Sequence, residues 1–141
     1  MTFRLRLRVR YSECDAQGIV FNARWGDFID LACSEYTRAI FDRPYDWRLV
    51  KQTIEWRAPA RFDDVLDIAV TTTAIGTGSF TLGFAISRGD TALASAETVY
   101  VMVDNAANTK LPISPAARAA LARGAPGVVV DQAAAARPPN T

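Results

Sequence analysis

The segment NARWGDFIDLACSEYTRAIF, residues 22–41, decides the fold of this chain. Asn22 is a residue type that often caps a helix, because its side chain can accept a hydrogen bond from a free amide of the first turn. Pro44 stops a helix from continuing further. We therefore predict one helix of about 19 residues that starts at Asn22 and carries an apolar stripe. The stripe consists of Trp25, Phe28 or Ile29, Ala32, Tyr36 and Ile40.

Strand patterns lie on both sides of this helix. Residues 3–10 alternate apolar side chains with four arginines, which predicts a strand with one buried face and one solvated arginine face. Extended or alternating patterns follow the helix at residues 52–62, 64–75, 79–88 and 91–104. Only short turns connect the last three of these segments, so they are expected to pair antiparallel.

The C-terminal part of the chain predicts one more helix. Ser114 is the expected N-cap, Pro115 the first helical residue and Gly124 the stop. We expect residues 125–141 to form a poorly ordered tail, which leaves a single domain at residues 1–124.

These elements predict an α+β fold in which a five-stranded antiparallel sheet wraps one long helix, followed by a short C-terminal helix. Such a sheet leaves one face and its edges uncovered, so we expect a homodimer or homotetramer.

Composition narrows the possible functions. The chain has 141 residues, of which 50% are hydrophobic and 22% charged, and its net charge of +1 argues against nucleic acid as a partner. No apolar run approaches the roughly 20 residues that span a bilayer. Arginines interrupt the N-terminal segment MTFRLRLRVR, so we expect no signal peptide and a cytoplasmic protein that does not bind membranes.

The chain contains no histidine. This absence excludes Ser-His-Asp and Cys-His catalysis and histidine-based metal sites. Cys14 therefore lacks the base that usually activates a cysteine, and we expect it to be a packed thiol. Acid–base chemistry in this chain must use carboxylates, lysine, tyrosine or the backbone.

The loop YSECDAQGIVF, residues 11–21, is the candidate for that chemistry. Asp15 precedes Asn22 by seven positions, with Gly18 between them. Free amides at the start of the helix can hold a developing oxyanion, and a nearby carboxylate can attack a carbonyl or activate water. An equally good interpretation from the residues alone is that Asp15 only fixes a turn.

The same loop, followed by Trp25 and Asp30 in a helix, resembles the signature of the 4-hydroxybenzoyl-CoA thioesterase family of hotdog-fold proteins. Residues 60–67 and 111–113 resemble two further segments of that family, so the likeness extends over residues 3–123. The predicted order of strand, helix and strands agrees with a hotdog fold.

The resemblance implies hydrolysis of a small aromatic or aliphatic acyl-CoA to the free acid and CoA. Asp15 would be the nucleophile or general base, and the helix N-terminus at Asn22 would polarise the thioester carbonyl. Asp30 would meet a polar acyl end, or else be a buried acid satisfied by hydrogen bonds. The implied substrate-binding residues are Gly18, Ile19, Val20, Phe21, Trp25 and Asp30.

The resemblance implies no cofactor and no metal. The acidic cluster of Asp63, Asp64 and Asp67 is more typical of turns and solvated surfaces than of a cation site. Two alternatives to the acyl-CoA thioesterase remain open from the sequence: a hotdog module that binds an acyl or aromatic ligand without turnover, and a thioesterase acting on acyl-carrier protein. Hydration of acyl thioesters would require a histidine that the chain lacks.

Overall fold

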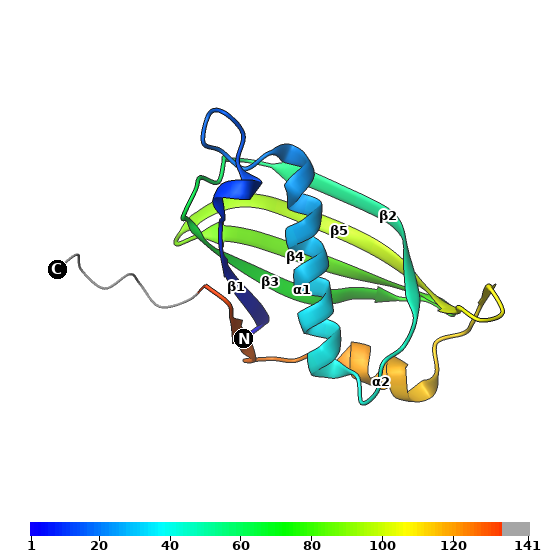
Figure 1. The fold of residues 1–141 in the computed structure, drawn as a ribbon. Helices are drawn as coiled ribbons and strands as arrows, with labels where there is room; N and C mark the ends of the chain where they lie inside the picture. Colours follow the sequence, from blue (N-terminus) through cyan, green and yellow to red (C-terminus); the bar gives the residue numbers. More distant parts are fainter. Residues whose placement is uncertain (134–141) are drawn as a thin grey trace.

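The computed structural model describes residues 1–133. Its strands are β1 (Phe3–Arg8), β2 (Trp47–Trp56), β3 (Val65–Ile75), β4 (Ser79–Arg88), β5 (Thr91–Asp104), β6 (Thr109–Lys110) and β7 (Val129–Asp131). Its α-helices are α1 (Trp25–Ile40) and α2 (Pro115–Arg123), and two single 3₁₀ turns lie at Tyr11–Glu13 and Asn22–Arg24. Figure 1 shows α1 lying across one face of a curved sheet, with α2 below it.

The sheet has the strand order β2-β5-β4-β3-β1-β7, and β6 pairs with β5. All pairs are antiparallel except β1 with β7, which is parallel. The five long strands therefore form the predicted antiparallel sheet. The two extra strands are two and three residues long and sit at its margins.

The apolar stripe of α1 holds the two layers together. Its buried residues are Trp25, Phe28, Ile29, Ala32, Cys33, Tyr36, Thr37 and Ile40. Consecutive buried positions are alternately three residues and one residue apart, so every buried side chain lies on one face of the helix, as predicted. They pack against alternating residues of β1, β3 and β4, and the Tyr36 hydroxyl shares a 2.8 Å hydrogen bond with the Thr72 hydroxyl.

The predicted N-cap, first residue and stop of α2 are confirmed. The Ser114 hydroxyl accepts a hydrogen bond from the N–H of Ala117 at 3.2 Å, and Pro115 is the first helical residue. Gly124 follows the helix with a φ of 63°, a backbone conformation that favours glycine.

Three predicted boundaries need correction. The α-helix begins at Trp25 rather than Asn22, because Asn22–Arg24 form a tighter 3₁₀ turn first. Strand β2 begins at Trp47, five positions before the predicted start at residue 52. Residues 129–131, expected to belong to a tail, pair with β1 as β7. The expectation for residues 134–141 lies outside the described residues.

Acidic partners neutralise the arginine face of β1. Ion pairs join Arg4 to Asp67 at 3.1 Å, Arg6 to Asp131 at 3.3 Å and Arg8 to Asp63 at 3.4 Å. One of these partners belongs to β7, so the arginines hold the C-terminal strand in place as well as meeting solvent.

The other edge of the main sheet is β2. Most of its residues are exposed, and Leu49 and Val50 keep 44% and 57% of their surface accessible. In Figure 1 the strand runs along the rim of the sheet beside α1. A ten-residue edge with exposed apolar side chains is a surface that favours pairing with another chain.

Candidate active site

Asp15 opens a tight hairpin loop. Its backbone N–H donates to the carbonyl of Ile19 at 2.8 Å, and its own carbonyl accepts from the N–H of Gly18 at 3.0 Å. Gly18 has a φ of 77°, a conformation that most other residues avoid, and a Cβ at this position would meet no atom within 4 Å. Gly18 is therefore required by the shape of the turn rather than by a close neighbour within the protomer.

The carboxylate of Asp15 serves this turn with one oxygen only. Oδ1 accepts hydrogen bonds from the N–H of Gln17 at 2.8 Å and of Ile19 at 3.4 Å. No residue within 1–133 donates a hydrogen bond to Oδ2. The residue is exposed, so the second oxygen is open to a ligand. The turn-forming and chemical interpretations of Asp15 are thus compatible with each other.

A second segment supports the far side of the hairpin. The N–H of Val20 donates to the carbonyl of Ala60 at 2.8 Å, and the N–H of Phe62 donates to the carbonyl of Gly18 at 3.4 Å. Ile19 lies opposite Arg61 in an isolated antiparallel bridge. The position of the Asp15 loop therefore depends on residues 60–62, more than 40 positions along the chain.

Glu13 shapes the start of the loop. Its side chain is buried, with Oε1 accepting from the N–H of Arg10 at 2.7 Å and Oε2 from the Arg10 guanidinium at 3.1 Å. Its carbonyl accepts from the N–H of Phe21 at 2.9 Å. Glu13 is therefore a structural acid of the loop, and its carboxylate already has partners.

Asn22 begins the 3₁₀ turn that leads into α1. Its carbonyl accepts from the N–H of Trp25, and the N–H of Arg24 donates to the carbonyl of Phe21 at 2.8 Å. Within the described part of the chain, the N–H groups of Asn22 and Ala23 have no acceptor. The prediction that the Asn22 side chain caps the helix is wrong, because neither the turn nor α1 has a side-chain cap.

A cavity of about 280 Å³ lies beside Asn22. Four residues predicted to bind substrate or polarise it lie in its wall: Ile19, Val20, Asn22 and Trp25. The opposite wall is the segment Trp56, Arg57, Ala58 and Pro59 at the end of β2. That segment was not among the predicted site residues. The available signal was Trp56, an aromatic residue three positions before Pro59.

The remaining predicted residues lie outside this wall. Asp15 and Gly18 lie in the neighbouring hairpin, and Phe21 is exposed over 55% of its surface. Asp30 is on the solvent side of α1 and forms no hydrogen bond with residues 1–133, so the interpretation as a buried, satisfied acid is wrong. Its negative charge contributes to raising the pKa of Cys33, after the larger effect of burial.

Neither cysteine has the environment of a nucleophile. Desolvation and the nearby charges of Glu13, Asp15 and Asp64 raise the pKa of the Cys14 thiol. Burial raises the pKa of the Cys33 thiol to about 11. Both groups therefore remain thiols near neutral pH.

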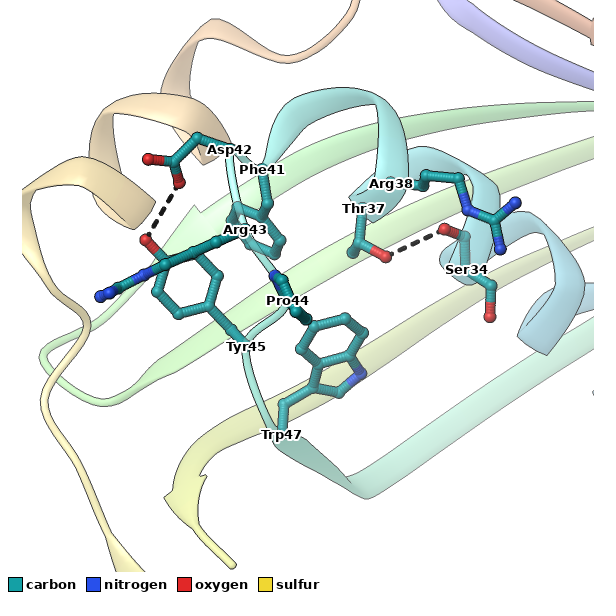
Figure 2. Close-up of a pocket in the computed structure, with 9 residues that line it drawn as sticks. All are labelled: Ser34, Thr37, Arg38, Phe41, Asp42, Arg43, Pro44, Tyr45 and Trp47. Carbon is teal, nitrogen blue, oxygen red and sulfur yellow. Dashed lines mark hydrogen bonds between the residues drawn. The ribbon is translucent and has the colours of Figure 1, made fainter.

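A larger cavity, about 380 Å³, lies at the opposite end of α1, where the chain enters β2. Figure 2 shows the aromatic side chains of Phe41, Tyr45 and Trp47 on one side of it and Ser34, Thr37 and Arg38 on the other. None of the predicted site residues lines it. Volume therefore does not identify the site.

The acidic cluster is divided among different partners. Asp63 pairs with Arg8 and Asp67 with Arg4, while Asp64 lies 2.8 Å from the guanidinium of Arg88. Within residues 1–133, no three histidine, cysteine or acidic side chains are grouped as metal ligands. The same part of the chain has no helix with the length and apolar character needed to cross a membrane.

Comparison with known proteins identifies relatives of this chain. Residues 9–121 match the family described as the thioesterase-like superfamily. The acyl-CoA thioester hydrolase YbgC of Escherichia coli is 33% identical over 110 residues, which cover 72% of this chain and 82% of that protein.

Two solved structures share the fold. A gentisyl-coenzyme A thioesterase superposes with a TM-score of 0.76 at 25% identity, covering 84% of this chain and 98% of its own. A 1,4-dihydroxy-2-naphthoyl-CoA thioesterase from Synechocystis has a TM-score of 0.77 at 21% identity, with coverages of 86% and 96%.

Proposed function

Since the chain belongs to the thioesterase-like superfamily and has the hotdog fold, we propose that it hydrolyses a small aromatic or aliphatic acyl-CoA to the free acid and CoA. Its class, a thioester hydrolase, follows from the family and from the named relatives. We further propose the size of the acyl group, a preference for CoA and the catalytic residues.

One observation carries the residue assignment. Asp15 has a carboxylate oxygen that receives no hydrogen bond from residues 1–133. It precedes the backbone amides of Asn22 and Ala23, which have no acceptor in the same part of the chain, and Asn22 lines a cavity. Acyl transfer needs a base or nucleophile together with donors for the oxyanion. These groups supply both functions without a histidine.

In the proposed reaction the thioester carbonyl lies at the start of α1, where the free N–H groups and the helix dipole favour negative charge on its oxygen. Asp15 either attacks the carbonyl carbon or removes a proton from an attacking water. The carbon–sulfur bond then breaks and CoA leaves as the thiolate. The thiolate takes the proton that Asp15 removed from water when water attacks, or a proton from solvent when Asp15 itself attacks. If Asp15 is the nucleophile, water hydrolyses the resulting anhydride and regenerates the carboxylate.

The acyl group would occupy the cavity beside Asn22. Trp56 contributes exposed aromatic surface to the site and Ile19 an apolar side chain, with the buried Val20 and Trp25 behind them. A volume of about 280 Å³ suits a single ring or a short chain better than a long fatty acyl group.

We also propose that two copies of the chain associate through β2. Among residues 1–133 nothing pairs with the outer edge of this strand, which exposes Leu49, Val50 and Trp56, and Trp56 also belongs to the cavity wall. A second copy would cover these apolar residues and would close the site from the open side.

The function is tested by incubating the purified protein with a panel of aromatic and aliphatic acyl-CoAs and measuring release of free thiol. We expect turnover of at least one short or aromatic substrate. Thermal stabilisation by acyl-CoAs with no thiol release would favour the binding module instead. Faster turnover of acyl-carrier-protein substrates than of their CoA counterparts would reassign the substrate.

A further inference from the structure

Arg88, the last residue of β4, reaches from the sheet to the segment that supports the Asp15 loop. Its Nη1 atom donates to the carbonyl of Pro59 at 3.1 Å and to Oδ2 of Asp64 at 2.8 Å. The two acceptors are five positions apart, one on each side of residues 60–62. A single guanidinium therefore ties both ends of the supporting segment to the sheet.

Asp64 extends this connection into the segment itself. The same Oδ2 atom accepts a hydrogen bond from the N–H of Arg61 at 2.8 Å, and the N–H of Asp64 donates to the carbonyl of Arg61 at 3.1 Å. Asp63, inside this turn, has a φ of 71°, a strained conformation for a residue with a side chain. Such a turn persists only when surrounding contacts hold it.

The supported segment in turn contacts the hairpin of Asp15. Ala60 accepts from Val20, Arg61 lies opposite Ile19, and Phe62 donates to Gly18. Arg88 thus connects to the loop through Asp64 and residues 60–62, without touching the hairpin itself.

We propose that Arg88 and Asp64 are positioning residues that set the geometry of the Asp15 loop relative to the start of α1. This proposal rests on the catalytic role of Asp15 proposed above. A carboxylate on a surface hairpin needs such a fixed support, because small displacements of a reacting group lower the rate steeply.

A matched control distinguishes positioning from general stabilisation. The Arg4–Asp67 pair lies in the same sheet, has a similar distance of 3.1 Å and is comparably exposed, at 48% and 27% against 37% and 21% for Arg88 and Asp64. In the described structure, Arg4 forms no hydrogen bond or ion pair with residues 59–64 or with the loop at residues 14–20. Arg4→Met therefore removes the same charge from the sheet without loosening the support.

The experiment compares Arg88→Met, Arg88→Lys, Asp64→Asn and Arg4→Met with the unaltered chain. It measures kcat and KM on the best acyl-CoA, the thermal midpoint, and hydrogen exchange of the Val20 and Phe62 amides. We expect Arg88→Met and Asp64→Asn to lower kcat about 10-fold or more at unchanged KM, and to speed exchange at both amides. Arg88→Lys should restore most of the rate, since an ammonium can donate to the same two acceptors. Arg4→Met should change neither quantity.

Unchanged kcat and unchanged exchange in Arg88→Met would overturn the proposal, as would an equal loss in Arg4→Met. The proposed function fails separately, if the unaltered chain hydrolyses none of the substrates; exchange at Val20 and Phe62 then still decides whether Arg88 holds the loop. If Arg88→Met does not fold, Asp64→Asn provides the same comparison, because it removes the negative charge that pairs with Arg88 while the asparagine oxygen can still accept from the N–H of Arg61.

Discussion

Oδ1 of Asp15 accepts a 2.8 Å hydrogen bond from the backbone N–H of Gln17, while Oδ2 has no donor among residues 1–133. One carboxylate therefore shapes the hairpin with one oxygen and presents the other to solvent. This division of roles makes the structural and chemical contributions of Asp15 separable by mutation.

Asp15→Asn and Asp15→Ala should differ in stability. Asparagine retains an oxygen that can accept from Gln17, whereas alanine removes the acceptor and loosens the turn. We expect a thermal midpoint close to that of the unaltered chain for Asp15→Asn and a lower one for Asp15→Ala. Differential scanning calorimetry of the two variants checks this; equal midpoints would show that the hydrogen bond to Gln17 does not contribute.

The oxyanion role assigned to the Asn22 amide predicts opposite effects of two substitutions. Asn22→Ala keeps the N–H, and the side chain that it removes caps neither the turn nor α1, so kcat should change little. Asn22→Pro removes the N–H at the first position of a helical turn, where proline is tolerated and where Phe21 already has the extended backbone that precedes proline.

We expect kcat of Asn22→Pro to fall about 100-fold or more, as when an oxyanion donor is removed elsewhere. Circular dichroism and thiol-release kinetics on both variants provide the measurement. Equal rates for the alanine and proline variants would assign the oxyanion to other donors.

Association through β2 predicts sensitivity to charge on that edge. Val50→Asp places a carboxylate on an exposed position of this edge strand, so the variant should sediment as a monomer while the unaltered chain sediments as a dimer or larger species. Leu111→Asp is the matched control, because Leu111 is also exposed but lies outside β2. If the unaltered chain stays monomeric at all concentrations, two copies do not pair through β2.

Cys33 predicts a loss of stability in alkali. Burial raises its pKa from 9.0 to about 11, so the folded state keeps a proton that the unfolded state loses first. Its contribution is complete below about pH 9 and disappears as the pH rises through 11, amounting to about 3 kcal/mol. Urea titrations at several pH values should show a steeper alkaline decline for the unaltered chain than for Cys33→Ala; parallel declines would contradict this.

Local patterns predicted most of the fold. The stripe of α1 and the Ser114 cap of α2 follow from residues within a few positions of each other, and both are confirmed. The 3₁₀ turn at Asn22 was missed because a cap residue indicates that a helix starts nearby, not which kind of turn comes first. Strand β7 was missed because it is three residues long and depends on the distant pairing of Asp131 with Arg6.

Part of the candidate site could likewise be predicted from local sequence, and part of it could not. Asp15, Gly18 and Asn22 lie close together in the sequence, and their spacing indicated a loop before a helix. The opposite cavity wall near Trp56 and the support from Ala60 arise where segments about 40 positions apart meet, a relationship that no local pattern contains. No local pattern indicated Arg88, because its link to the loop consists of contacts with Pro59 and Asp64 in the folded chain.

The central claim is that the carboxylate of Asp15 performs the chemistry, and Asp15→Asn tests it most directly. Asparagine is nearly isosteric and can preserve the hairpin, yet it can neither attack a thioester efficiently nor accept a proton from water. The measurement is kcat for release of free thiol from the best acyl-CoA, made on folded Asp15→Asn and on the unaltered chain. We expect kcat to fall about 100-fold or more with the fold intact; turnover equal to that of the unaltered chain would show that another group performs the chemistry.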